Sequence, residues 1–141
     1  TKAHTGRLTD TTFVDMNLNT EELVYNYRIV LYDQNNVRVD TSFTASSVRL
    51  AAQGGETTVD LAWQAEVPWS NQTEGFPLHD IFRGAPGQPD EALVLIDQVD
   101  VNAGGMRYTD EGRYQNTPLN KNEVYCYRVM TRGAYGNPRV D

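Results

Sequence analysis

The chain has 141 residues, of which 39% are hydrophobic and 22% charged, an ordinary composition for a globular protein that can build a core. Lys and Arg number 12 against 19 Asp and Glu, and the formal net charge of −7 disfavours nucleic acids and anionic membrane surfaces as partners. No run of residues approaches the roughly 18 consecutive apolar side chains of a membrane-spanning helix, so we expect no membrane insertion.

The first 45 residues predict a β-hairpin. Residues 24–32 alternate in polarity and are rich in β-branched and aromatic side chains. The polar run 33–36 supplies a turn, and residues 37–44 return as a second strand.

The rest of the chain predicts further short strands separated by turns. An opening strand is expected near residue 47, and the others cover residues 57–64, 79–83, 93–101, 106–109 and 124–131. Residues 102–105 form one of the predicted turns, and no segment has a helical apolar stripe long enough to predict a helix. Short strands with turns every 8–12 residues are typical of a β-sandwich, so the predicted fold class is all-β.

One sequence element occurs twice, 100 residues apart. Tyr25-Asn26-Tyr27-Arg28 is matched by Tyr125-Cys126-Tyr127-Arg128, and upstream of each, Phe13-Val14-Asp15 is matched by Tyr108-Thr109-Asp110. A spacing near 100 residues is too long for a solenoid repeat and has the size of a small domain. The chain is therefore predicted to belong to a tandem array of sandwich domains.

The repeat sets the predicted domain boundaries. Residues 1–45 would be the C-terminal part of one repeat, with strands E, F and G, and residues 46–141 a nearly complete second repeat with strand G truncated. About 45 residues are too few to fold alone without disulfides or metal. They would be completed by residues before Thr1 or by another chain. The predicted linker, Ala45-Ser46, is short and contains no Gly or Pro, which favours a semi-rigid rod.

Alternation also predicts which side chains form the core. Trp63 is expected to be buried, and Tyr125, Tyr127 and Val129 are expected to share the inner face of their strand, because Arg128 on the other face prefers solvent. In the first copy, Tyr25, Tyr27, Ile29 and Leu31 are expected to face inward in the same way.

These positions resemble fibronectin type III domains. Leu61-x-Trp63 is similar to the strand-B Leu-x-Trp of that family, and Leu119 six residues before Tyr125, followed by Tyr127 and Val129, is similar to its tyrosine-corner line. The chain departs from that line at Lys121 and Glu123. The resemblance implies immunoglobulin-like β-sandwiches in tandem.

A second set of motifs is similar to the fibronectin-like repeats of very long Bacteroidetes surface proteins. It includes Val67-Pro68-Trp69-Ser70-Asn71, Tyr108-Thr109-Asp110-x-Gly112 and Tyr135-Gly136-Asn137-Pro138. This resemblance implies a secreted or cell-surface protein linked to gliding motility. It would be exported by the type IX secretion machinery through a region outside this sequence. It also implies that Cys126 is a half-cystine whose partner lies after Asp141.

The residue types do not assemble a catalytic set, so the protein is predicted not to be an enzyme. His79 beside Asp80 is interpreted as a strand-edge histidine at a loop, and Asp97 with Asp100 as surface carboxylates rather than a glycosidase pair. Residues 33–36 and 100–102 are rich in oxygen ligands. Calcium is therefore the one possible cofactor, with ordinary turns as the alternative.

Residues 67–78 form the predicted recognition loop. Trp69 and Phe76 lie among amides such as Asn71, a combination that suits stacking on sugar rings. The alternative is that Trp69 folds back and covers the end of its own sandwich.

The function predicted from these features is a non-catalytic, structural or adhesive repeat region, acting as a semi-rigid spacer or adhesin stalk. Its partners would be adjacent repeats and surface glycans or other cell-surface proteins. Two alternatives remain open: a carbohydrate-binding accessory module of a secreted polysaccharide-degrading enzyme, and a self-assembling extracellular fibre subunit.

Overall fold

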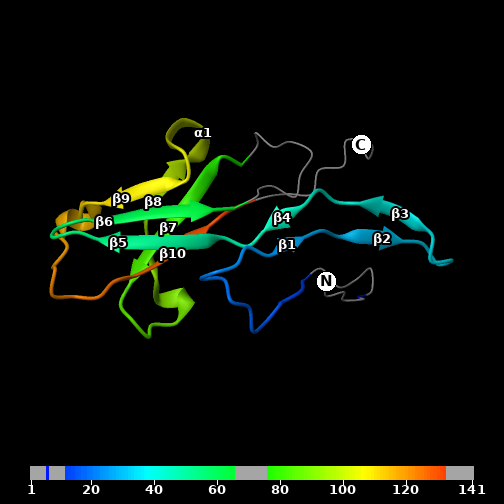
Figure 1. Cartoon of the computed structure of the whole chain (residues 1–141), viewed down its shortest axis with the longest axis horizontal. Helices are drawn as coiled ribbons and strands as arrows, with labels where there is room; N and C mark the ends of the chain where they lie inside the picture. The colour runs from blue at the N-terminus through cyan, green and yellow to red at the C-terminus, as the bar shows by residue number, and fades with distance from the viewer. Residues whose placement is uncertain (1–5, 7–11, 66–75, 133–141) are drawn as a thin grey trace.

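The computed structural model describes residues 6, 12–65 and 76–132, and within them the chain is all-β with little helix (Figure 1). The strands pair antiparallel in four small sheets. In chain order the elements are β1 (Asn26–Tyr27), β2 (Val30–Tyr32), β3 (Arg38–Thr41), β4 (Ala45–Ser46), β5 (Arg49–Gly54), β6 (Val59–Gln64), β7 (Leu78–Gly84), a 3-10 turn (Asp90–Ala92), β8 (Val94–Asp100), α1 (Val101–Gly104), β9 (Arg107–Asp110), a second 3-10 turn (Tyr114–Asn116) and β10 (Cys126–Met130).

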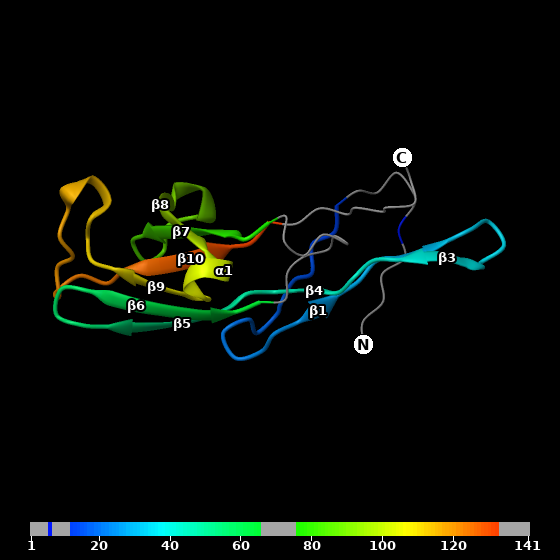
Figure 2. The same cartoon turned by 90° about the horizontal axis from the view of Figure 1, so that it is seen from above.

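Two three-stranded sheets make up the larger part of the described chain. One has the order β5-β6-β9 and the other β10-β7-β8, and Figure 2 shows them as two layers. Their shared core contains Leu61 and Trp63 from β6, Ile81 from β7 and Val129 from β10. Trp63 is only 4% exposed, which confirms its predicted place in the core.

Residues 26–46 form a long, interrupted hairpin. β2 pairs with β3, and β1 pairs with β4 with Tyr27 opposite Ala45. Between these pairs the Ser42 amide donates to the Ile29 carbonyl at 2.8 Å, and the Ile29 amide donates to the Ser42 hydroxyl at 2.8 Å. These two hydrogen bonds between Ser42 and Ile29 hold the two chain segments together where the strand pairing is interrupted.

The predicted turn at residues 33–36 is confirmed. The Asp33 carboxylate accepts from the amides of Asn35 and Val37, both at 2.8 Å, and Asn36 has a positive φ of 59°. In Figure 1 this turn and the β5–β6 turn lie at opposite ends of the long axis, so the hairpin and the two sheets follow each other end to end.

Two local predictions were wrong. Ala45-Ser46 is not a linker but strand β4, because its pairing with β1 continues almost to the start of β5, and only Ser47 and Val48 separate the two strands. The predicted turn at 102–105 overlaps the short helix α1. The backbone amides of Asn102 and Ala103, at the start of α1, donate hydrogen bonds to the Asp100 side chain at 3.0 and 3.4 Å.

The prediction that Ile29 and Leu31 face a core was also wrong for this chain. They are 59% and 40% exposed, whereas Val129, the counterpart of Ile29, is 7% exposed. In the second copy a second sheet covers Val129, and among the described residues no such sheet covers the hairpin of the first copy.

Candidate functional site

The clearest local feature is a hydrogen-bonded corner that occurs in both copies. The Asn120 amide donates to the Tyr125 hydroxyl at 2.9 Å, and the Asn19 amide donates to the Tyr25 hydroxyl at 3.2 Å. In each copy the same Asn also donates from its side chain to a Glu three residues later. The corner thus forms from local sequence in both places.

A second pair of bonds links each strand to an upstream Asp. The Tyr127 hydroxyl donates to Asp110 at 2.9 Å, and the Tyr27 hydroxyl donates to Asp15 at 3.3 Å. Burial, then the hydrogen bond and charge of Asp110, raise the pKa of Tyr127. Burial and Asp15 also raise the pKa of Tyr27. Both hydroxyls therefore remain protonated donors at neutral pH.

In the second copy Asp110 is the centre of a buried polar network. Its carboxylate is 1% exposed and accepts from Arg83 at 2.8 Å and from the Gly112 amide at 2.8 Å, besides Tyr127. Arg83 also lies over the ring of Tyr125, with its guanidinium carbon 5.8 Å from the ring centroid. The network joins β7, β9 and β10 with the corner.

The segment between β4 and β5 is hydrogen-bonded to the corner at Tyr25. The Tyr25 amide donates to the Ser47 hydroxyl at 3.0 Å, and the Ser47 amide donates to the Tyr25 carbonyl at 2.8 Å. The Arg49 side chain donates to the Glu21 carbonyl at 3.3 Å. The corner at Tyr25 therefore contacts the segment that leads into β5 and the first residue of that strand.

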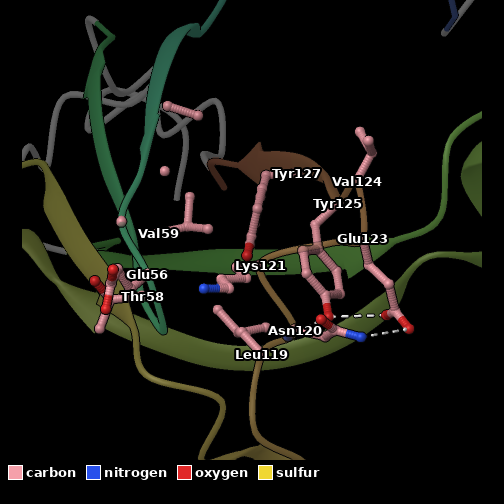
Figure 3. A pocket seen from close by; sticks show the side chains of 13 residues that line it. Glu56, Thr58, Val59, Leu119, Asn120, Lys121, Glu123, Val124, Tyr125 and Tyr127 are labelled. Carbon is pink, nitrogen blue, oxygen red and sulfur yellow. Dashed lines mark hydrogen bonds between the residues drawn. The ribbon is translucent and has the colours of Figure 1, made fainter.

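A shallow groove lies at the matching corner of the second copy (Figure 3). It has a volume of about 260 Å³. One wall is the β5–β6 turn with Ala52, Gly54 and Val59, and the other is the corner with Tyr125 and Tyr127. The groove was not predicted from the sequence, because its walls are about 65 residues apart in the chain and the motif at Tyr125 does not indicate that the β5–β6 turn will lie opposite it.

His79 and Asp80 lie in the core rather than at an accessible strand edge, so the interpretation of His79 was wrong. Both are 0% exposed, and His79 Nδ1 accepts from the Trp63 indole N–H at 2.9 Å. The sequence suggested a loop position because His79 lies at the start of its strand, but β7 is paired with β10 on one side and β8 on the other, and both residues are buried. Asp80 accepts from Gln98 at 2.6 Å and from Arg132 at 2.6 and 3.1 Å.

The pKa values of this pair follow from that packing. Burial lowers the pKa of His79 and outweighs the opposing charge of Asp80. Burial alone raises the pKa of Asp80, but hydrogen bonds from Gln98 and Arg132 outweigh it, and the net pKa is lowered. At neutral pH the cluster therefore holds a neutral imidazole and an ionised carboxylate.

The carboxylates considered for catalysis or calcium have local partners. Asp100 caps α1, and Asp33 bonds amides of its own turn. The partner of Asp97 is Tyr108. Burial, together with the charge and hydrogen bond of Asp97, raises the pKa of Tyr108 to about 12. Among the described residues no group of three or more His, Cys, Asp or Glu side chains is placed to hold a metal ion.

The predicted recognition loop is only partly described. Trp69 and Asn71 lie outside the described residues, and Phe76 is half-buried just before β7. Cys126 is a half-buried free thiol opposite Gly84 in the β10–β7 pairing. The sugar-binding loop and the disulfide of Cys126 both stay predictions.

Within the described ranges, no helix is long and apolar enough to cross a membrane. In comparisons with known proteins, no family model matches the chain, and neither a curated protein nor a solved structure matches it significantly.

Proposed function

We propose that the chain is a non-catalytic region of tandem fibronectin type III-like repeats that acts as a semi-rigid spacer or adhesive stalk. The observation that supports this best is the duplicated corner. Two segments 100 residues apart form matching bonds, Asn19 to Tyr25 and Asn120 to Tyr125. The strand pairing of the second copy, β5-β6-β9 and β10-β7-β8, is compatible with a sandwich of that family.

The exposed apolar side chains support an incomplete first repeat. Eleven of the fifteen exposed large hydrophobic residues in the described chain lie between Phe13 and Phe43. Six of them lie on the hairpin of residues 26–46, and the other five lie in the segment before it. An exposed set of that size suits a surface that other residues of a repeat cover.

The junction supports the semi-rigid part of the proposal. Two hydrogen bonds, one of them to the Ser47 hydroxyl, join Tyr25 and Ser47, and only two residues separate β4 from β5. A connection that short, with hydrogen bonds across it, restricts rotation between neighbouring units.

A spin-label experiment tests the rod. Labels would be placed on the exposed turns at Asn35→Cys and Thr57→Cys in a Cys126→Ser background, and the distance distribution measured by pulsed electron resonance. We expect a narrow distribution that broadens when two glycines are inserted between Ser47 and Val48. A distribution already as broad as that of the glycine variant would overturn the proposal.

We also propose a secreted or cell-surface location with export by the type IX machinery, which rests on the motif resemblance alone. Protease added to intact cells of the source organism should remove the protein. Retention of the full-length protein under conditions that strip known surface proteins would contradict this location.

A further inference from the structure

A buried hydrogen bond joins the end of β6 to the start of β7. The Trp63 indole N–H donates to His79 Nδ1 at 2.9 Å, and the two residues are 4% and 0% exposed. An indole N–H can only donate, so Nδ1 of His79 is unprotonated and the neutral ring holds its proton on Nε2. Protonation would place a second N–H on Nδ1, directed at the indole N–H, and would therefore break this hydrogen bond.

Within the described chain, the surroundings of His79 offer an imidazolium little compensation. Nε2 is buried and has no hydrogen-bond partner among the described residues, so both ring N–H groups of the charged form would lack an acceptor. Burial lowers the pKa of His79, and the opposing charge of Asp80 does not reverse this. Asp80 already accepts hydrogen bonds from Gln98 and Arg132.

The charged groups around this end of β7 are engaged with other partners. They are Asp80 on β7 (with Arg132), Asp97 on β8 (with Tyr108), Asp100 at the end of β8 (with the first amides of α1) and Arg132 after β10 (with Asp80). The neighbours of His79 on β6 and β8, Trp63 and Val99, carry no charge. Protonation of His79 would therefore create a buried charge without a counter-ion of its own.

The Trp63–His79 bond lies next to the segment that leads from the hairpin into β5. Trp63 pairs with Leu50 of β5, and Val48 packs against the core that contains Trp63. Directly before Val48, the Ser47 amide donates to the Tyr25 carbonyl at 2.8 Å. Opening of the sheets at Trp63 would therefore loosen the support of the segment between β4 and β5.

We propose that the Trp63–His79 hydrogen bond is an acid-sensitive latch: protonation of His79 opens this end of the sheets β5-β6-β9 and β10-β7-β8 and loosens the segment between β4 and β5. The proposal rests on the proposed function, because it names mild acid as a condition that reduces the stiffness of the spacer.

The direction of the pH effect follows from the burial of the ring. A histidine released from the interior has a pKa of about 6.5, and in the closed form the pKa of His79 is lowered. The closed form is therefore fully favoured above about pH 6.5, and it becomes less favoured as the pH falls towards the pKa of His79 in the closed form.

Hydrogen exchange of single amides, followed by NMR on the 141-residue chain, tests the latch. The probes are the Trp63 amide, which donates to the Met106 carbonyl, and the Ser47 amide. Between about pH 7.5 and about pH 5.5, after correction for the chemical exchange rate, the protection of both should fall roughly three- to tenfold. Low concentrations of urea should raise their exchange with less than about half the slope of global unfolding, because the latch opens only one end.

His79→Gln is the matched variant. A glutamine carbonyl can accept from the Trp63 indole, but the side chain takes up no proton near neutral pH, so the variant should lose the pH dependence at both amides. A second measurement on the unaltered chain covers the case that this variant does not fold. The ring ¹⁵N signals of His79 should show a proton on Nε2 and none on Nδ1 at neutral pH, and a proton on Nδ1 would overturn the latch.

Equal protection at both pH values, a urea slope equal to that of global unfolding, or a pH dependence that survives His79→Gln would also overturn the proposal. So would an effect at Trp63 without one at Ser47, because the opening would then not reach the segment between β4 and β5. Broad spin-label distances at neutral pH would instead overturn the rod and leave the exchange result unaffected, so the two proposals can fail separately.

Discussion

Replacing Asp110 by Asn should be among the most damaging single changes in this chain. Both carboxylate oxygens accept hydrogen bonds: one from the Gly112 amide at 2.8 Å, and the other from Arg83 at 2.8 Å and Tyr127 at 2.9 Å. An amide has one acceptor oxygen, so its NH₂ group must face a donor on one side. Whichever way Asn is turned, at least one buried bond is lost.

The charge adds to this loss. The side chains of Arg83 and Asp110 are 12% and 1% exposed, so Asp110→Asn leaves a largely buried guanidinium without its counter-ion. Removing one partner of a buried pair typically costs about 3–5 kcal/mol. The slight exposure of Arg83 favours the lower end, about 3 kcal/mol, which is a large share of a total stability of roughly 5–15 kcal/mol.

Urea unfolding followed by tryptophan fluorescence measures this effect. With a denaturant slope of about 1–3 kcal/mol per molar, the midpoint should fall by roughly 1 M or more. Asp15→Asn is the matched control, because the bond from Tyr27 to Asp15 is longer, at 3.3 Å, and the carboxylate is only half-buried. Its expected cost is at most about 1 kcal/mol. Equal midpoint shifts for the two variants would refute the reasoning.

Three further predictions use the same assay. Val129→Ala should lower the free energy of unfolding by about 2–3 kcal/mol, because the side chain is 7% exposed. Ile29→Ala should change it by no more than about 0.5 kcal/mol, because that side chain is 59% exposed. Similar changes for the two variants would mean that the hairpin is covered. Gly112→Ala should lower the free energy of unfolding by at least about 2 kcal/mol, because φ is +70° and a Cβ would lie 2.7 Å from the backbone nitrogen of Leu119. A loss below about 1 kcal/mol would show that the backbone of this turn can shift to accommodate the Cβ. Folding lowers the pKa of His79 below 6.5, so the unfolded chain binds the extra proton first as the pH falls. The free energy of unfolding should therefore decrease below about pH 6.5, by up to about 1.4 kcal/mol per pH unit for this group. The decrease should end once the pH reaches the pKa of His79 in the folded chain. His79→Phe should flatten that part of the profile, and an identical slope in the variant would contradict the assignment to His79.

The strand pattern predicted the core because it depends on a period of two residues. Leu61 and Trp63 alternate along β6, and both are nearly inaccessible to solvent, at 2% and 4%. The corner was also predictable, because Tyr125 bonds a residue only five positions away. Properties that are local in sequence were therefore within reach of sequence reasoning.

The missed features depend on pairing between distant segments. Nothing near His79 in the sequence indicates that the Trp63 indole, 16 residues earlier, will bond to its ring. The role of Asp110 as the centre of a network likewise depends on Arg83, 27 residues away, on another strand. The alternation at Ile29 and Leu31 predicted an inner face that the described chain does not show, because alternation contains no information about whether a second sheet covers a face.

The two copies separate local from tertiary contributions within one molecule. Tyr25 keeps its corner bond although most large apolar side chains around it are exposed, and Tyr125 makes the same bond beside a closed core. The corner therefore does not require the second sheet. Burial does require it, because Val129 is 7% exposed beneath that sheet and its counterpart Ile29, which has no such cover in the described chain, is 59% exposed. It follows that a second sheet adds mainly apolar burial rather than new local geometry at the corner.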